Sequence, residues 1–239
     1  MERNSGKYLI IAVLGVVFVA LLVATYLYYT KPLVVPGETL GCKIIEKNGE
    51  PGSKIDVVFL FDGVEEQAAE EYIDYFFSVA PFNDSRSKFN FYSVNFQPEC
   101  GIQSGILFCY SRDALKAAAL CPNEYIIVLS KQSASTRSSS YINLMIVNTA
   151  NLKSVVPHEF AHAFANLADE YASNVIPRGS RNCVTACSNF KTETDGCFSG
   201  CAKDSYFRSI DNGLMRTLRT TDYGKFNKAI IGESLNEYS

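Results

Sequence analysis

The sequence lacks an excess of positive charge. Its 239 residues contain 22 lysines and arginines against 25 aspartates and glutamates, which gives a formal net charge of -3. A protein that binds nucleic acid needs a basic surface to neutralise phosphates, so nucleic acid is excluded as a partner. The chain also lacks an internal repeat. At this length it can bury the core of one domain, and a second independent domain would be crowded.

Histidine is scarce, which makes its placement informative. The only two histidines, His158 and His162, lie four residues apart. In a helix that begins at the N-cap Ser154, with Pro157 tolerated in its first turn, both imidazoles lie on one face and can bind a single zinc ion. Glu159 can then accept a proton from a zinc-activated water. This is the HExxH arrangement of zinc peptidases.

The third zinc ligand is expected among the acidic residues that follow. In a straight helix Asp169 would lie about 10 Å beyond His162, so the helix must end and the chain must turn back. Asn166 is the residue best suited to the left-handed conformation that ends a helix. With a turn there, Asp169 is the first choice as third ligand and Glu170 the second. The one that does not bind is expected to orient a histidine.

The segment from His158 to Tyr171 resembles the signature of the IgA-peptidase family of zinc metallopeptidases, whose pattern ends in the same Leu-Ala-Asp-Glu-Tyr. Softer likenesses cover residues 54–63 and 206–216. The resemblance implies a zincin-like fold with a long active-site helix. It also implies that Met215 forms a turn beneath the metal as in metzincins, and plain core packing of this methionine is the alternative. The family's substrate, immunoglobulin A, is not carried over to this chain.

An uncharged and almost wholly apolar stretch occupies residues 8–29. At about 1.5 Å per residue it can cross a hydrocarbon core of roughly 30 Å, which predicts one transmembrane helix in a lipid bilayer. A cleaved signal peptide is the alternative, although the bulky residues 25–29 do not resemble a small-residue cleavage site. More positive charge precedes this stretch than follows it, so residues 1–7 are expected in the cytoplasm and the rest of the chain outside the cell.

All eight cysteines follow the apolar stretch, and an oxidising compartment favours disulfides. Four of them form a paired CxxxC arrangement that makes either two disulfides or a second, structural zinc site: Cys183, Cys187, Cys197 and Cys201. The other four are expected to form two disulfides whose connectivity stays open: Cys42, Cys100, Cys109 and Cys121.

The remaining pattern predicts an α/β domain with a small mixed sheet over residues 54–239, preceded by a stalk rich in proline and glycine at 30–53. Strands are expected at 54–61, 89–96, 124–129 and 141–147, and helices at 64–77 and 112–120. The polar segment 131–140 is either a solvated connector or a lid. The exposed strand 141–147 can pair with an extended substrate. Three further donors can stabilise an oxyanion: Tyr171, Tyr206 and Arg208.

These features predict a membrane-anchored zinc endopeptidase that acts on a peptide or protein substrate outside the cell. His158, His162 and Asp169 bind Zn²⁺ in this hypothesis, and Glu159 is the catalytic general base. The alternative is an extracellular binding or adhesion module whose zinc stabilises the fold without turnover. An intact Glu159 argues against the alternative, because a purely structural site needs ligands but no base.

Overall fold

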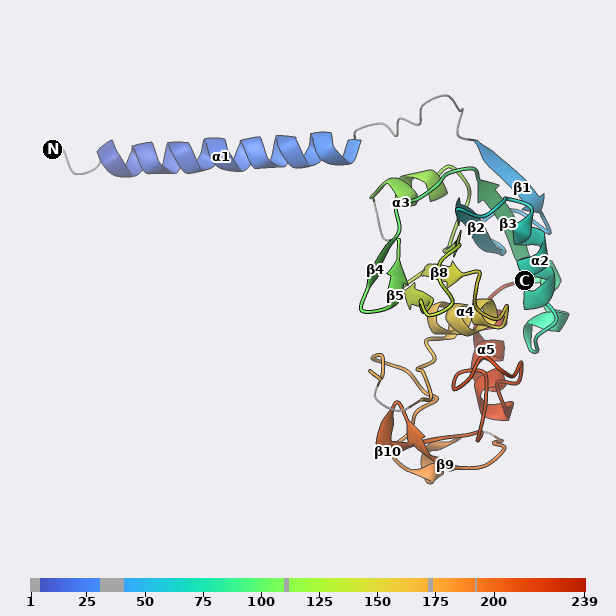
Figure 1. Cartoon of the computed structure of the whole chain (residues 1–239). Helices are drawn as coiled ribbons and strands as arrows, with labels where there is room; N and C mark the ends of the chain where they lie inside the picture. Colours follow the sequence, from blue (N-terminus) through green and yellow to red (C-terminus); the bar gives the residue numbers. More distant parts are fainter. Residues whose placement is uncertain (1–4, 31–40, 110–111, 172–173, 192) are drawn as a thin grey trace. The chain divides into compact units, whose positions relative to one another are not determined.

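The computed structural model describes residues 5–30, 41–109, 112–171, 174–191 and 193–239. The chain divides into two compact units, Met1–Glu38 and Thr39–Ser239 (Figure 1). The first unit contains helix α1 (Ser5–Thr30). Both histidines belong to the second unit.

The predicted transmembrane helix at residues 8–29 is wrong. Within the part of the chain that the structure describes, no helix combines the length and the apolar character needed to cross a membrane. The single-pass membrane localisation, with residues 1–7 in the cytoplasm and the domain outside, is therefore not supported. Residues 1–4 lie outside the described residues.

A six-stranded mixed sheet forms the centre of the second unit, in the order β1-β3-β2-β6-β8-β7. The four central strands run parallel to one another, and the two edge strands, β1 and β7, are antiparallel to their neighbours. The predicted α/β architecture with a mixed sheet is confirmed. The strands are β1 (Cys42–Glu46), β2 (Ile55–Asp62), β3 (Phe89–Val94), β6 (Tyr125–Ser130), β7 (Ser139–Tyr141) and β8 (Leu144–Asn148).

The sheet begins earlier in the chain than the sequence suggested. β1 pairs with β3 and lies within the segment 30–53 that was expected to be a stalk. Gly41 precedes this strand and Gly49, Pro51 and Gly52 follow it, so the residues that indicated a linker instead bound a short edge strand. Residues 31–40 of the expected stalk lie outside the described part of the chain.

One expected strand is a hairpin. The segment 141–147 divides into β7 and β8 around a turn at Ile142 and Asn143. β8 is fully buried and pairs on one side with β6 and on the other with β7. The expectation of an exposed strand at 141–147 is therefore wrong, because a continuous apolar run such as Leu144–Val147 is typical of a strand covered on both faces.

The helix that carries the two histidines, α4 (Val155–Ala165), lies between β8 and α5 (Lys225–Leu235) (Figure 1). Phe160 fixes it in the core: its ring centroid lies 5.0 Å from that of Phe76, 5.6 Å from that of Phe82 and 5.9 Å from that of Phe89. Such ring contacts add to the free energy gained from burial. The remaining helices are α2 (Ala68–Phe76) and α3 (Arg112–Ala118).

Four disulfides join all eight cysteines: Cys42–Cys121, Cys100–Cys109, Cys183–Cys201 and Cys187–Cys197. The disulfide prediction is confirmed, and no thiolate is left for the alternative of a second zinc site. Disulfides form and persist in an oxidising environment. Cys100–Cys109 closes the hairpin of β4 (Gly101–Gln103) and β5 (Ile106–Phe108), and the last two disulfides hold the segment around the hairpin of β9 (Phe198–Cys201) and β10 (Lys203–Arg208).

Candidate metal centre

The histidine side chains are oriented by backbone carbonyl groups. Nδ1 of His158 lies 2.9 Å from the carbonyl oxygen of Leu214, and Nδ1 of His162 lies 2.6 Å from that of Leu167. Because a carbonyl oxygen can only accept, each neutral imidazole carries its proton on Nδ1 and has a free lone pair on Nε2. The two Nε2 atoms are 3.2 Å apart. Two metal-binding nitrogens therefore face a common point.

The helix ends where the sequence indicated. Asn166 has φ +50° and ψ +38°, the left-handed conformation, and it terminates α4. Its side chain donates a hydrogen bond to the carbonyl oxygen of Arg178 at 3.0 Å. This prediction is confirmed. The prediction for the other end of the helix is only half right, because Ser154 occupies the N-cap position but its hydroxyl donates to the carbonyl oxygen of Leu218 instead of capping the helix.

The turn at Asn166 brings Asp169 back to the histidines. Its Oδ1 atom lies 3.2 Å from Nε2 of His158 and 3.1 Å from Nε2 of His162. The three atoms form a group that can hold a metal ion. They come from one helix and the loop directly after it, so a short stretch of sequence builds the whole group.

The geometry fits a tetrahedral ion. Ligand bonds of about 2.0–2.1 Å in a tetrahedral zinc site place neighbouring ligand atoms about 3.3 Å apart, close to the 3.1 to 3.2 Å found here. Oδ1 of Asp169 is buried and has no hydrogen-bond partner among the described residues, since both Nε2 atoms are acceptors in this tautomer. A buried carboxylate oxygen without a partner is costly, and a cation between the three atoms removes that cost.

The carboxylates around this point have opposite pKa shifts. Burial raises the pKa of Glu159, and the neighbouring histidines oppose this only in part. Burial also disfavours the ionised form of Asp169, but the two imidazoles outweigh it and lower the pKa of this carboxyl below its usual range. Burial alone would lower the pKa of His162, whereas Asp169 and Glu159 raise it to about 9 in the metal-free site. A metal binds the neutral imidazole and therefore displaces this proton. Negative charge on Asp169 is thus held at the point where a cation would bind.

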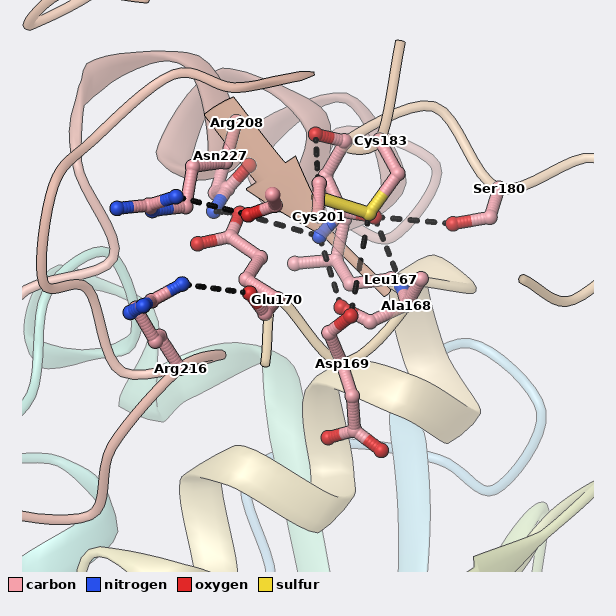
Figure 2. The surroundings of a disulfide bond; sticks show 12 residues. Leu167, Ala168, Asp169, Glu170, Ser180, Cys183, Cys201, Arg208, Arg216 and Asn227 are labelled. Carbon is pink, nitrogen blue, oxygen red and sulfur yellow. Dashed lines mark hydrogen bonds between the residues drawn. A yellow bond between two sulfur atoms is a disulfide. The ribbon is translucent and has the colours of Figure 1, made fainter. Parts of the chain in front are cut away.

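Glu170 points away from the histidines. Figure 2 shows its carboxylate on the other side of the chain from that of Asp169. Its Oε1 atom accepts hydrogen bonds from Asn227 at 2.8 Å and from Asn182 at 3.2 Å, and burial raises its pKa to about 7 in spite of them. The expectation that the second acidic residue orients a histidine is wrong, because the backbone carbonyls already do so.

The candidate metal centre lies in a cleft of about 1350 Å³. Residues of the polar segment 131–140 line one wall, so this segment contributes to the cleft and is more than a solvated connector. Tyr171 lines it as well, and its hydroxyl donates to Oδ2 of Asp169 at 2.9 Å. Arg208 does not reach the cleft. It is buried and donates to the carbonyl oxygens of Ser199 and Gly200, so it is not an oxyanion donor.

Two further residues that the sequence singled out, Tyr206 and Met215, do not line the cleft. Tyr206 packs against the small cluster around the Cys183–Cys201 disulfide and is not part of the cleft lining. Met215 lies in a turn whose backbone contacts the site: the carbonyl oxygen of Leu214 bonds to His158, and that of Met215 accepts from the amide of Glu170 at 2.8 Å. The Met215 side chain is fully buried in the main core, so the turn and the core packing are both present.

Comparison with known protein families gives no match, and no curated protein is significantly similar to the chain. The resemblance to the IgA-peptidase family therefore rests on the residues from His158 to Tyr171 themselves.

Asn182 holds the loop that carries Asp169, a role that no sequence pattern indicates. Its Oδ1 atom accepts from the amide of Ala168 at 2.7 Å, and its Nδ2 atom donates to the carbonyl oxygen of the same residue at 2.8 Å. The pair of bonds fixes the backbone directly before Asp169. Asn182 lies in a segment rich in polar residues, where one more asparagine carries no local signal.

We expect Asn182→Ala to lower the affinity for zinc by about 10–100-fold, the usual cost of losing a group that orients a ligand. The free energy of unfolding should fall by about 2–3 kcal/mol, because two buried backbone groups lose their partner. Zinc competition titration and thermal unfolding measure the two effects. Asn189→Ala, at an exposed asparagine of the same region, should change neither. Unchanged zinc affinity in Asn182→Ala would show that the loop holds its position without this side chain.

The Cys183–Cys201 disulfide lies against the same loop (Figure 2). Sγ of Cys183 is 3.9 Å from the carbonyl oxygen of Asp169, and Sγ of Cys201 is 3.6 Å from that of Asn182. The Cys187–Cys197 disulfide of the same region joins cysteines 10 residues apart, compared with 18 for Cys183–Cys201. Both crosslinks close short loops, so they can be compared in one experiment.

We expect removal of either crosslink, as Cys183→Ala with Cys201→Ala or Cys187→Ala with Cys197→Ala, to lower the free energy of unfolding by about 3 kcal/mol. Only the double substitution of Cys183 and Cys201 should also weaken zinc binding, by about tenfold, because only the Cys183–Cys201 disulfide contacts the loop of Asp169. Both proteins are compared by chemical denaturation and zinc titration. Equal zinc affinity in the two would mean that the Cys183–Cys201 disulfide does not position the ligand.

Proposed function

We propose that this chain is a zinc-dependent endopeptidase. The observation that carries the proposal is the triangle of His158 Nε2, His162 Nε2 and Asp169 Oδ1, with Glu159 next to it, in the wall of a large cleft. Two imidazole nitrogens and one carboxylate oxygen are a typical ligand set of catalytic zinc, which keeps a further position open for water or substrate. The resemblance of residues 158–171 to the IgA-peptidase family supports the same activity.

Zinc, when bound, supplies Lewis-acid activation of water and of the scissile carbonyl group. The chain's own residues handle the proton. Glu159 accepts it from the attacking water and passes it to the nitrogen of the leaving amine. Burial, which raises the pKa of Glu159, makes this carboxylate a stronger base. Tyr171 and Asn174 both donate to Oδ2 of Asp169 and hold the carboxylate with Oδ1 toward the histidines.

The purified chain should contain about one zinc ion and should cleave members of a random peptide library. A zinc chelator should stop the cleavage, and added zinc should restore it. Zinc without any cleavage of the library would contradict the proposal and favour the alternative, a binding module whose metal is structural. Cleavage that survives complete removal of the metal would contradict the role of zinc.

A further inference from the structure

The cleft carries an unusual share of the exposed apolar side chains. Among described residues of the second unit, nine large hydrophobic side chains are exposed, and five of them line the cleft: Tyr141, Ile142, Leu152, Tyr171 and Val175. Exposed apolar surface that gathers in one concavity is typical of a binding site, whereas scattered single residues are not.

Ile142 is held in a conformation that its side chain disfavours. It has φ +56° and occupies the turn between β7 and β8, and it is 71% exposed. A β-branched residue in the left-handed region is strained, and such turns normally take glycine, asparagine or aspartate. Exposure leaves this side chain little packing to offset the strain. Residues strained in this way cluster at functional sites, so the fold places an apolar side chain at the cleft where stability alone favours a different residue.

The charges of the cleft favour an acidic ligand. Among the described residues that line it, the cationic ones, apart from the two histidines, are Arg137 and Arg216, and the only acidic ones are Glu159 and Asp169 of the metal centre. A divalent cation at that centre would offset the charge of the two carboxylates, so that the arginines would make the electrostatic potential of the cleft positive. Arg137 is exposed, and its backbone is fixed by two 2.9 Å hydrogen bonds, with Gly105 and Leu107 of the hairpin that Cys100–Cys109 closes.

We infer that the cleft selects peptide segments in which a large apolar side chain lies close to an acidic one. The apolar side chain packs on Ile142 and its neighbours in the cleft, and the acidic one pairs with Arg137. This inference names the substrate class of the proposed peptidase and rests on that function. It accounts for both the strained isoleucine and the arginine, neither of which contributes to the metal centre.

Profiling of cleaved sequences in a random peptide library tests the inference with three variants of the full chain. In Ile142→Asn, enrichment of large apolar residues beside the cleavage site should disappear, and kcat/KM for the best wild-type peptide should fall about 5–20-fold, mainly through KM. Its melting temperature should stay equal or rise, because asparagine tolerates positive φ. In Arg137→Gln only the preference for acidic residues should disappear. Ile102→Asn, at an exposed isoleucine outside the cleft lining, should match the wild type.

An unchanged profile in Ile142→Asn, or an equal loss on all peptides together with a lower melting temperature, would overturn the inference. Binding of the same library to Glu159→Gln separates this inference from the proposed function. If the wild type cleaves no peptide, while peptides with apolar and acidic residues are still retained in an Ile142-dependent way, the peptidase proposal fails and the selectivity stands. If cleavage is zinc-dependent but shows no preference for apolar and acidic residues, the peptidase proposal stands and the inferred selectivity fails.

Discussion

Replacement of Glu159 by glutamine should lower kcat/KM for peptide hydrolysis by roughly 10³–10⁴-fold, near the upper end of what a general acid–base group contributes. The amide of glutamine has the same size as the carboxylate but cannot accept the proton of the attacking water. Glu159 is not among the three groups that can hold the metal. Zinc content should therefore remain at the wild-type level.

Steady-state kinetics on one cleaved peptide, elemental analysis and thermal unfolding of the same samples measure this prediction together. His162→Ala serves as the comparison, because it should lose zinc and activity at once. A Glu159→Gln protein that keeps more than about a tenth of the activity would show that another group takes the proton. One that loses its zinc would show that Glu159 supports the metal and would leave its role as a base without support.

Asp169→Asn should weaken zinc binding by clearly more than the roughly 10–100-fold that follows loss of a merely orienting group. The substitution keeps the shape of the side chain but removes the negative charge beside the two imidazoles. Glu170→Gln, at the adjacent residue, should leave zinc affinity within about twofold of the wild type. Its carboxylate is held by Asn182 and Asn227, on the other side of the chain from the histidines.

Competition with a chelator of known zinc affinity measures both variants under identical conditions. Peptide hydrolysis should be lost in Asp169→Asn and kept in Glu170→Gln. The opposite pattern, with zinc lost from Glu170→Gln and retained by Asp169→Asn, would mean that the loop after Asn166 rearranges when the metal binds. The two variants thus decide between the alternatives that the sequence left open.

The part of the site that the sequence could predict depends on local geometry. The spacing of His158 and His162 places both rings on one helix face, and Asn166 adopts the left-handed conformation because asparagine tolerates it better than most residues. Likewise, the strands β2 and β6 follow from continuous apolar runs. In each case the physical cause lies within a few residues of its effect.

The part that escaped prediction depends on contacts between distant segments. Asn182 bonds to Ala168 fourteen residues away, and His158 to the carbonyl oxygen of Leu214 fifty-six residues away. No local pattern marks such partners, because polar side chains find them only when the fold is complete. The pairing of β1 with β3 is non-local in the same sense, so the short sequence of β1 between glycines and a proline also fits a linker.

The hydrogen bonds from His158 and His162 to the carbonyl oxygens of Leu214 and Leu167 make the ligand orientation resistant to both substitution and acid. Every amino acid brings the same carbonyl group, so no exchange at either leucine removes the acceptor itself. A carbonyl oxygen also does not titrate, unlike the carboxylates that orient many zinc-binding histidines. The groups that orient the ligands therefore set no lower limit on the pH at which this centre can hold its metal.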